Sequence, residues 1–389
     1  MKPILIRVTT IPASLNKLLE GQLKFMNKYF DVIAVSSDDK ELYLVAKKEN
    51  VKIYPLNMTR KITPFKDFIS LIKMYYLFKK IKPIIVHTHT PKAGIIGMCA
   101  SYFASVPVRL HTIAGMPLLE SKGLKKKLLI FIEKLTYFFS NQVYCNSKNL
   151  MATLINQNMI SRDRIKVISH GSSNGIDLKV FNPNTISLKV KNKLKLKLKI
   201  KKNDFVFIYV GRIVKDKGIN ELIYSFKSLL KEFKSIKLLL IGPFEDNLDP
   251  IDKKHKNYIF NNKNIIYLGY KDDVRPYLSI SNLFVFPSYR EGFPNALLQA
   301  SAMGLPCIAT NINGCNEIIY DNYNGSLINS KSKKLLYSKM RKYLIDKDYY
   351  KKMKLNTYKT IKDKFDRKDF LKKLLKEYNF NLKKKNIYL

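Results

Sequence analysis

The sequence predicts an α/β protein made of two tandem doubly wound domains, each built on a parallel sheet. Three observations lead to this prediction. The chain has 389 residues, enough for two large domains at roughly 150 residues each. Short apolar runs alternate with segments of helical spacing, which is typical of repeated βαβ units. This alternation stops near residue 190 and then starts again.

In the first half, six runs are predicted to be strands buried on both faces, because they are apolar without alternation. These runs cover residues 3–8, 31–36, 51–56, 83–88, 106–112 and 143–146. Helical segments lie between them, such as the one before residue 83, in which Phe68, Leu71 and Ile72 recur at helical spacing. We therefore expect an N-terminal domain over residues 1–189.

In the second half, the same pattern predicts strands over residues 204–210, 236–241, 264–268, 283–287 and 306–310. An amphipathic helix is expected after the first of them, with Ile219, Leu222 and Phe226 on its apolar face. Residues 190–204 are highly charged and are interpreted as a linker that runs into the first strand. The chain beyond Lys331 is charged and helical, without a further strand. A C-terminal domain over residues 190–389 follows.

The charge balance is strongly basic. Lysine and arginine number 71 against 30 acidic residues, a formal net charge of +41. Such a charge suits a polyanionic partner, either nucleic acid or an anionic membrane. Only ten of the basic residues are arginine, the side chain suited to bidentate recognition, so lysines spread over solvated faces explain most of the charge. Since no zinc-finger spacing or other binding module is present, we expect no nucleic-acid partner, and a charge-driven nucleic-acid-binding protein remains the alternative outside the enzymes.

Four cysteines, at positions 99, 145, 307 and 315, are far apart and form no C-x-x-C pair. Neither a disulfide framework nor a zinc site is expected. The apolar N-terminal stretch is interrupted by Arg7, and no run of 18 apolar residues occurs. We expect a cytoplasmic protein that is soluble or peripheral to a membrane.

A glycine-bounded loop follows the strand at 204–210. It reads Gly-Arg-Ile-Val-Lys-Asp-Lys-Gly from Gly211 to Gly218 and precedes the amphipathic helix. The glycines permit close backbone approach, Arg212 offers a planar fork, and Lys217 offers a point charge near a helix N-terminus. The loop is therefore predicted to bind phosphate; a basic surface turn is the alternative.

A second loop follows the strand at 283–287. It carries one carboxylate, Glu291, and then a helix start at which the amides of Phe293 and Asn295 can hold an anion. Gln299 lies further along this helix. The spacing suits contacts to a sugar hydroxyl, a diphosphate and a ribose in series; the alternative is that Glu291 only caps the helix. No G-x-G-x-x-G and no P-loop motif follows a strand, which argues against a dinucleotide oxidoreductase or a P-loop enzyme.

Three of the five histidines lie at the ends of two predicted neighbouring strands. We expect His87 and His89 to point to opposite faces of their strand, with His87 structural and His89 and His111 in a cleft. Lys92, close after His89, is a further cleft candidate. Because no carboxylate accompanies these histidines, no metal site is expected.

The two loops resemble those of glycosyltransferase family 4, the retaining nucleotide-sugar enzymes of GT-B fold. The resemblance spans nearly the whole chain and implies two Rossmann-like domains facing across a cleft. It implies that Arg212 and Lys217 bind the donor diphosphate, together with Gly211 and the amides of Phe293 and Asn295. Glu291 then contacts the donor sugar. Gln299 departs from the family pattern, in which a glutamate binds the ribose; we expect weakened or altered nucleotide binding, but an active enzyme.

The same resemblance assigns His111 to the neighbourhood of the reacting sugar. The stretches at residues 87–94 and 167–177 look like those of members that build bacterial surface polysaccharides, such as O-antigen or capsule, on a polyprenyl diphosphate carrier. His89, Lys92 and Ser14 are the candidates for contacts to the acceptor. Ser14 lies in a loop, residues 9–14, where many relatives have a Gly-Gly pair.

The resemblance thus implies a hexosyltransferase that moves a sugar, with UDP as the expected carrier, to a hydroxyl of a lipid-linked saccharide with retention. No metal or cofactor is expected, because the cationic groups can hold the diphosphate. An epimerase that uses the same cleft is the alternative within the fold. Residues 121–132 join a lysine cluster to an apolar stretch containing Phe131, which favours a helix on the anionic inner face of the membrane. The alternative is an ordinary amphipathic helix that buries Leu128, Ile132 and Leu135.

Overall fold

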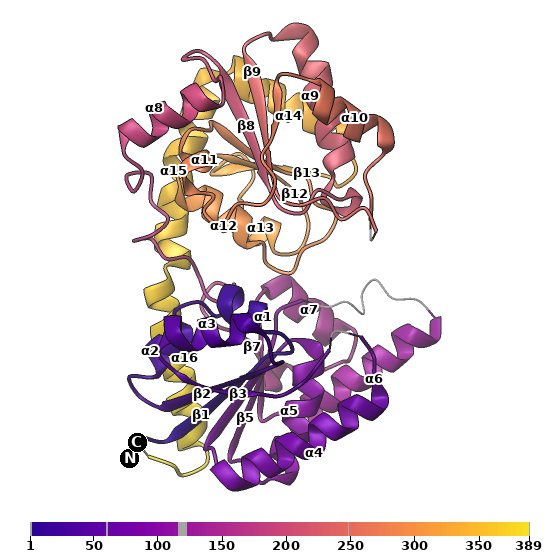
Figure 1. Ribbon diagram of the computed structural model, residues 1–389, viewed down its shortest axis with the longest axis vertical. Coiled ribbons are helices and arrows are strands. Elements are labelled where there is room, and N and C mark those ends of the chain that lie inside the picture. The colour runs from indigo at the N-terminus through magenta and orange to yellow at the C-terminus, as the bar shows by residue number, and fades with distance from the viewer. Residues whose placement is uncertain (1, 60, 116–122, 248, 389) are drawn as a thin grey trace. The chain divides into compact units, whose positions relative to one another are not determined.

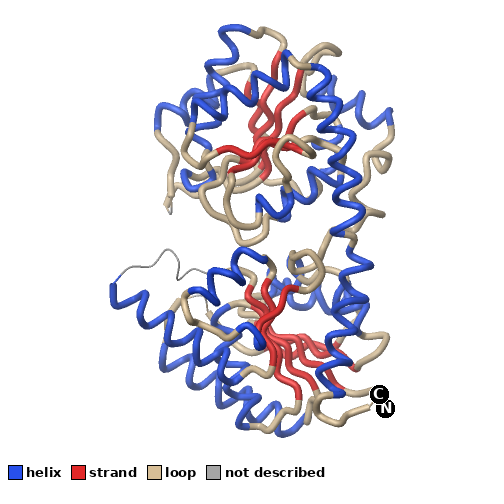
Figure 2. The backbone as a smooth tube through the Cα atoms, turned by 180° about the vertical axis from the view of Figure 1, so that it is seen from behind, coloured by secondary structure: helices blue, strands red, loops and turns tan. Residues whose placement is uncertain are grey.

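The computed structural model describes residues 2–59, 61–115, 123–247 and 249–388. The chain folds into two compact units, each of which is described by itself. The first unit contains residues 1–175 together with the C-terminal segment Arg367–Leu389, and the second contains Ile176–Asp366. In each unit a single central sheet is flanked by helices (Figure 2).

The first unit has a seven-stranded parallel sheet in the order β3-β2-β1-β4-β5-β6-β7 (Figure 1). Its strands are β1 (Ile4–Val8), β2 (Asp31–Ser36), β3 (Lys52–Pro55), β4 (Ile85–His89), β5 (Val108–Ile113), β6 (Gln142–Cys145) and β7 (Ile165–Val167). The chain reverses its direction across the sheet between β1 and β4. In doubly wound sheets, ligands bind beside the carboxyl ends of the strands at such a switch point.

Helices cover both faces of this sheet. The helices are α1 (Pro12–Leu18), α2 (Gln22–Met26), α3 (Lys40–Glu49), α4 (Pro64–Ile81), α5 (Pro91–Phe103), α6 (Gly123–Phe139), α7 (Lys148–Asn156) and α16 (Arg367–Lys383), with a 3-10 turn η2 (Arg162–Arg164). One apolar core joins α1, α2, α3 and α16 to the sheet, while α4 and α5 contribute to a separate core. The two sets of helices therefore cover opposite faces of the sheet.

The second unit has a six-stranded parallel sheet in the order β10-β9-β8-β11-β12-β13. Its strands are β8 (Phe205–Val210), β9 (Ile236–Ile241), β10 (Ile265–Tyr267), β11 (Leu283–Phe286), β12 (Cys307–Thr310) and β13 (Gly325–Ile328). Its helices are α8 (Leu188–Lys197), η3 (Lys215–Lys217), α9 (Ile219–Glu232), α10 (Lys253–Asn261), α11 (Arg275–Ser279), α12 (Asn295–Ala302), α13 (Cys315–Ile318), α14 (Lys333–Ile345) and α15 (Lys347–Phe365). The switch point lies between β8 and β11, the strands that precede the two predicted binding loops.

The predicted strands are confirmed, and two more are present. Both missed strands are short edge strands: β7 has three residues, and β13 has four and begins with a glycine. The prediction of a linker over residues 190–204 is wrong, because more than half of this segment belongs to α8. Ser187 caps that helix by accepting a hydrogen bond from the amide of Val190.

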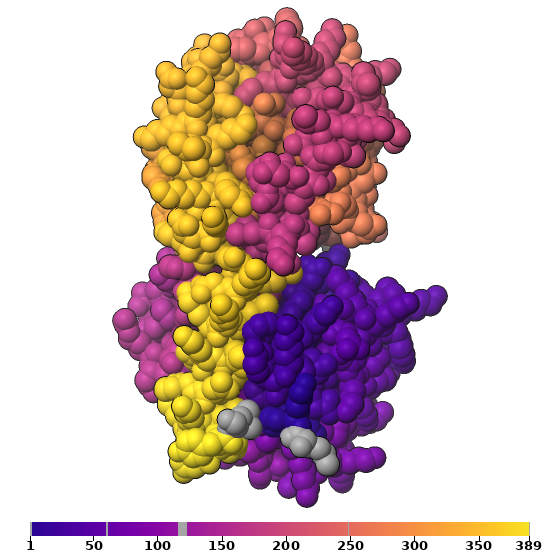
Figure 3. Space-filling model, turned by 90° about the vertical axis from the view of Figure 1, so that its left-hand side faces the viewer, coloured from indigo at the N-terminus to yellow at the C-terminus, as the bar shows by residue number. Residues whose placement is uncertain are grey.

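The unit boundaries differ from the predicted domains 1–189 and 190–389. The change of unit falls at Gly175–Ile176, and the C-terminal helix α16 returns to the first sheet. It does so because its apolar stripe, which includes Phe370, Leu374 and Tyr378, is buried in the core of the first unit. Figure 3 shows this yellow segment lying against the indigo N-terminal helices. In the described part of the chain, no helix is long and apolar enough to cross a bilayer.

Candidate active site

The loop after β8 depends on its two glycines. Gly211 has φ +153° and Gly218 has φ +69°, conformations that side chains rarely adopt. A Cβ atom on Gly218 would lie 2.1 Å from the carbonyl oxygen of Pro287, directly after β11. The two predicted binding loops therefore meet backbone to backbone, and only glycine fits at their contact.

Lys217 and Glu291 join the same two loops through their side chains. The Lys217 Nζ atom lies 2.6 Å from Glu291 Oε1, and both side chains are largely buried, with exposed fractions of 14% and 13%. The residues are 74 positions apart in the sequence. The structure thus brings together, within one unit, the lysine predicted to bind the diphosphate and the glutamate predicted to contact the sugar.

Arg212 lies on the more exposed side of this region. Its guanidinium donates to Glu245 Oε2 at 2.6 Å, and its carbonyl accepts a hydrogen bond from the Tyr209 hydroxyl. Partial burial disfavours the charged guanidinium, but the Glu245 carboxylate outweighs this effect and raises the pKa of Arg212. Arg212 is therefore a permanent cation. Its carboxylate partner lies 33 positions away, and no local signal in the sequence identified it.

The loop after β11 enters α12 through Pro294, whose carbonyl accepts from the amides of Leu297 and Leu298. The Phe293 ring is buried and lies 5.7 Å from the ring of Phe365. Its side chain therefore belongs to the core, and only its backbone amide is suited to a ligand. Asn295 and Gln299 lie on the first two turns of α12 and are partly exposed.

In the first unit, His111 is buried within the second half of β5. Its Nδ1 atom lies 2.8 Å from the Thr88 hydroxyl, on the neighbouring strand β4. Burial lowers the pKa of His111 to about 3, so the ring is neutral at physiological pH. A Cβ atom on Gly94, in α5, would lie 2.6 Å from the ring. The absence of a side chain at Gly94 therefore leaves the space that the His111 ring occupies.

The prediction that His87 and His89 face opposite sides of their strand is wrong. Residues two apart in a strand share a face, and the two rings lie 4.3 Å apart. His87 has the expected structural role: it is buried, and its ring nitrogens lie 2.7 Å from the hydroxyls of Tyr378 and Thr112.

His89 is buried as well and contacts a fully buried arginine. The Arg7 guanidinium lies 2.8 Å from His89 Nε2, and it also donates to Gln22 Oε1 and to the Tyr378 hydroxyl. Burial lowers the pKa of His89, and the charge of Arg7 adds to this shift. Since Arg7 can only donate, the neutral His89 ring accepts at Nε2 and carries its proton on Nδ1. No local pattern in the sequence indicates this role of Arg7, because its partners come from α2, β4 and α16.

A small cavity lies beside this network. Its volume of about 10 Å³ is roughly that needed for one water molecule. The lining residues include Gln22, His87, His89 and Ser172. The Nδ1 atom of His89 has no hydrogen-bond partner among the residues that the structure describes. His89 therefore lines this small pocket.

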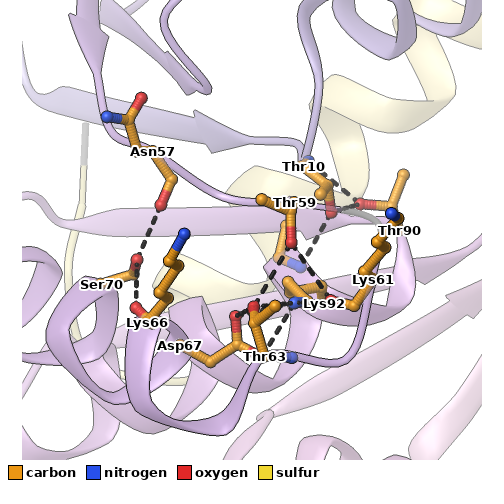
Figure 4. Close-up of polar contacts among 11 residues, drawn as sticks. Thr10, Asn57, Thr59, Lys61, Thr63, Lys66, Asp67, Ser70, Thr90 and Lys92 are labelled. Atoms are coloured by element: carbon orange, nitrogen blue, oxygen red, sulfur yellow. Dashed lines mark hydrogen bonds and ion pairs between the residues drawn. The ribbon is translucent and has the colours of Figure 1, made fainter.

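Lys92 holds α4 and α5 together at their N-termini. Its Nζ atom lies 2.7 and 2.8 Å from the two carboxylate oxygens of Asp67, and it also donates to Thr63 (Figure 4). In the same view, the hydroxyls of Thr10 and Thr90 lie 2.8 Å apart. Thr90 has φ +73°, which is unusual for a β-branched residue.

Ser14 was expected in a loop over residues 9–14, but it is part of α1. Its side chain is nearly buried, and its amide donates to the carbonyl of Ile11. Among the described residues, no group of three or more His, Cys, Asp or Glu side chains gathers in a way that could hold a metal ion.

Comparison with protein families matches both halves of the chain. Residues 190–360 match the model described as "Glycosyl transferases group 1", and residues 18–147 match "Glycosyl transferase 4-like". The chain is 35% identical over 367 residues to the capsular polysaccharide biosynthesis glycosyltransferase CapM of Staphylococcus aureus, covering 94% of each protein. It is 30% identical over 309 residues to an Escherichia coli enzyme named UDP-Gal:alpha-D-GlcNAc-diphosphoundecaprenol alpha-1,3-galactosyltransferase, covering 78% of this chain and 77% of that protein.

Solved structures share the fold. A glycosyltransferase from Rickettsia africae aligns with a TM-score of 0.78 at 21% identity, over 98% of this chain and 99% of that one. Anabaena HepE, solved in complex with UDP, aligns with a TM-score of 0.81 at 17% identity, over 97% and 99% of the two chains. Two Rossmann-like domains with parallel sheets, aligned over nearly the whole chain with these two structures, show the GT-B fold. The sequence matches add the family: the chain belongs to the group 1 glycosyltransferases, with relatives in capsule and surface-polysaccharide biosynthesis.

Proposed function

We propose that this protein is a retaining glycosyltransferase of the family 4 type. It moves a sugar from a nucleoside diphosphate, with UDP as the expected carrier, to a hydroxyl of a polyprenyl-diphosphate-linked saccharide in surface-polysaccharide synthesis. The observation that supports this proposal is the ion pair of Lys217 and Glu291, which joins the cation that we assign to the diphosphate to the carboxylate that we assign to the sugar. The name of the Escherichia coli relative states a UDP-linked donor and a diphosphoundecaprenol acceptor.

In the proposed reaction the donor diphosphate is the leaving group. Arg212, Lys217 and the amides of Phe293 and Asn295 stabilise the negative charge that develops on it, which is electrostatic catalysis. Gly211 permits the close approach of the backbone. In this proposal, the cationic and amide groups stabilise the charge of the leaving diphosphate, and no metal ion or cofactor is required.

Glu291 and His111 are assigned to the donor sugar. Glu291 accepts hydrogen bonds from sugar hydroxyls, and Lys217 holds its carboxylate in place. His111 is neutral, so it can accept or donate one hydrogen bond near the anomeric carbon without adding charge. Gln299 is assigned to the ribose, where an amide replaces a carboxylate. If Gln299→Ala leaves donor affinity unchanged, this ribose assignment is wrong.

The first unit is assigned to the acceptor. Because Arg7 engages His89 and Asp67 engages Lys92, we assign these two side chains to positioning the ends of β4 and α5. Ser14, in α1, contributes by donating its amide to the carbonyl of Ile11 in the loop between β1 and α1. A lipid-linked acceptor implies a peripheral position on the inner face of the cytoplasmic membrane.

Calorimetric binding of UDP and of GDP tests the donor site. We expect the wild type to bind UDP more tightly than GDP, and Arg212→Ala to weaken UDP binding roughly tenfold or more, since it removes a charge-assisted contact. Arg341→Ala is the matched control, because Arg341 forms a comparable ion pair with Glu232 elsewhere in the same unit. Equal UDP affinity in all three proteins would refute the diphosphate site.

Transfer itself is tested with a UDP-sugar and a polyprenyl-diphosphate-linked saccharide. NMR of the product, compared with the donor, reports the anomeric configuration. Retention supports the proposal, whereas inversion refutes the retaining mechanism. Consumption of the UDP-sugar to a new UDP-sugar without acceptor would identify an epimerase instead.

A further inference from the structure

Helix α4 carries a stripe of large apolar side chains on its solvent face. The exposed fractions are 78% for Phe65, 61% for Phe68, 39% for Ile69, 39% for Ile72 and 66% for Tyr76. Four of these positions, 65, 69, 72 and 76, follow the i, i+4, i+7, i+11 spacing of one helix face. The opposite face is apolar as well, because Met74, Leu77 and Phe78 are buried in the core. The outer stripe is therefore not needed to hold α4 on its own sheet.

Lysines border this stripe. Lys66, Lys73 and Lys80 recur every seven residues, so they form a row along one side of the stripe. All three are exposed. An apolar stripe beside a row of lysines is the pattern of a helix that lies in a membrane interface.

Helix α6 repeats the pattern. Leu124, Leu128, Phe131 and Phe138 are exposed by 83%, 46%, 59% and 63%, beside the exposed Lys125, Lys127 and Lys134. The expected burial of Leu128 by an amphipathic helix is wrong, because this side chain faces outward, although α6 buries Thr136 and Tyr137 on its inner face. Residues 121 and 122 of the predicted membrane segment lie outside the described residues. Leu124, Leu128 and Phe131 of this segment point to solvent as in a membrane-binding helix, whereas Leu129 and Ile130 pack against the core.

The two helices belong to one layer. Helix α5 packs against both α4 and α6, on the same side of the sheet (Figure 1). Its exposed Tyr102 and Phe103 add aromatic surface, and the ring of Tyr102 lies 6.4 Å from that of Phe138. We call the outer surface of α4, α5 and α6 the aromatic-lysine face.

The charge of this face is of one sign. Within the three helices, the acidic residues are Asp67 and Glu133. Asp67 is neutralised by its ion pair with Lys92, and Glu133 is buried. The exposed charges of these described helices are therefore all lysines.

We propose that the aromatic-lysine face docks the protein on an anionic lipid bilayer, with α4 and α6 lying in the interface. This inference rests on the proposed function, because a polyprenyl-linked acceptor is held in such a bilayer. The lysines favour anionic headgroups, and the aromatic and aliphatic side chains enter the acyl boundary. A second copy of the chain is a poorer occupant, since pairing two such faces would bring like charges together.

Vesicle co-sedimentation of the full chain, without donor or acceptor, tests the proposal. The probes are vesicles of phosphatidylglycerol and phosphatidylcholine, and vesicles of phosphatidylcholine alone. We expect binding to the anionic vesicles that weakens with salt. Replacing Lys66, Lys73 and Lys80 together by glutamine should reduce the partition coefficient by roughly a hundredfold, at about fivefold for each lysine. Phe65→Ser with Tyr76→Ser should reduce it at least about tenfold.

The matched control replaces three exposed lysines of α8, in the other unit: Lys189, Lys193 and Lys197 to glutamine. This control makes the same change of charge outside the aromatic-lysine face and should retain vesicle binding within about threefold. Absence of binding by the wild type, or an equal loss in both lysine triples, overturns the proposal. A second copy of the chain would be the occupant instead if the wild type is a dimer in gel filtration and binds no vesicles, and if the Phe65→Ser, Tyr76→Ser variant is a monomer. That outcome overturns the proposal.

This result is separable from the test of the proposed function. Vesicle binding needs no sugar transfer, and the variants of the aromatic-lysine face lie outside the unit that is proposed to bind UDP. We expect these variants to keep wild-type UDP affinity. Loss of UDP binding in the wild type would refute the donor site and leave the docking result standing.

Discussion

Lys217 and Glu291 form a largely buried ion pair, 2.6 Å between Nζ and Oε1, that links the loops after β8 and β11. Removing either partner leaves the other charge with poor solvation, so Lys217→Met and Glu291→Gln should each destabilise the fold by about 2–4 kcal/mol. The two variants should differ in function. Lys217→Met should weaken UDP binding, whereas Glu291→Gln should leave UDP binding nearly intact and lower kcat for transfer by roughly a hundredfold or more. Calorimetry and a transfer assay measure the two effects.

The control for this pair is the double variant. If the two side chains act mainly on each other, their effects on unfolding are strongly non-additive, and the double variant costs less than the sum. Equal losses of UDP affinity in both single variants would contradict the division of roles between phosphate and sugar.

The contact of Gly218 with Pro287 predicts a strong effect of a single methyl group. Gly218→Ala combines a left-handed backbone with a Cβ atom 2.1 Å from the Pro287 carbonyl oxygen. We expect a loss of more than about 3 kcal/mol of stability together with loss of UDP binding, since both loops must move. Gly269→Ala is the matched control, because Gly269 has a similar φ of +65° but open space around its Cβ position. That variant should cost only about 1 kcal/mol in urea unfolding, and equal costs would refute the steric argument.

The ion pair of Lys92 and Asp67 should contribute far more to stability than a surface pair. The side chains are exposed by only 12% and 24%, and Lys92 also donates to Thr63. Lys92→Met should therefore cost about 2–4 kcal/mol. In contrast, Lys52→Met breaks a pair with Asp31 in which the lysine is 68% exposed, and should cost at most about 1 kcal/mol. Thermal unfolding of the two variants checks this, and a similar loss in both would contradict a structural role of Lys92.

Glu133 predicts a pH dependence of stability. Burial raises the pKa of its carboxyl to about 7, although the neighbouring Tyr137 opposes the shift. In the unfolded chain the group titrates near 4.3. Between these values the folded state holds the proton more tightly, so the free energy of unfolding falls as pH rises from about 4.3 to 7 and stays level above that. The loss is on the order of 3 kcal/mol.

Glu133→Gln removes this titration. Relative to the wild type, the variant should therefore gain on the order of 2–3 kcal/mol in urea unfolding between pH 5 and pH 8. Glu232→Gln is the control, because Arg341 and Tyr337 lower the pKa of Glu232, which keeps it ionised over this range. A stability difference between wild type and Glu133→Gln that does not change with pH would contradict the buried carboxyl.

The local pattern was sufficient to predict most of the fold. The runs of β2 and β9 are mostly apolar and buried, and the predicted ranges 31–36 and 236–241 match the strands residue for residue. The edge strands β7 and β13 were missed because three or four residues carry too little pattern. Helix α8 is not evident from the sequence, since its alternating lysines and leucines bury no residue and its cap at Ser187 is a single weak signal.

The candidate site was predictable only as two loops. Glycine spacing and strand ends identified Gly211–Gly218 and the segment around Glu291, because backbone conformation and position after a strand are encoded locally. The side-chain partners of the candidate site residues were not predictable. Glu245 beside Arg212 and Asp67 beside Lys92 come from distant positions, and the shared face of His87 and His89 was misjudged.

The sequence by itself determined where most strands lie and which loops carry cations, carboxylates and histidines. It also determined the family, since the binding motifs are contiguous in the chain. The tertiary structure alone decided that Lys217 meets Glu291, that α16 returns to the first sheet to place Tyr378 beside Arg7, and that α4 is apolar on both sides. The reason is physical: local propensity and periodicity act over a few residues, whereas pairings across a parallel sheet depend on strand order and packing, which bring together positions far apart in the chain.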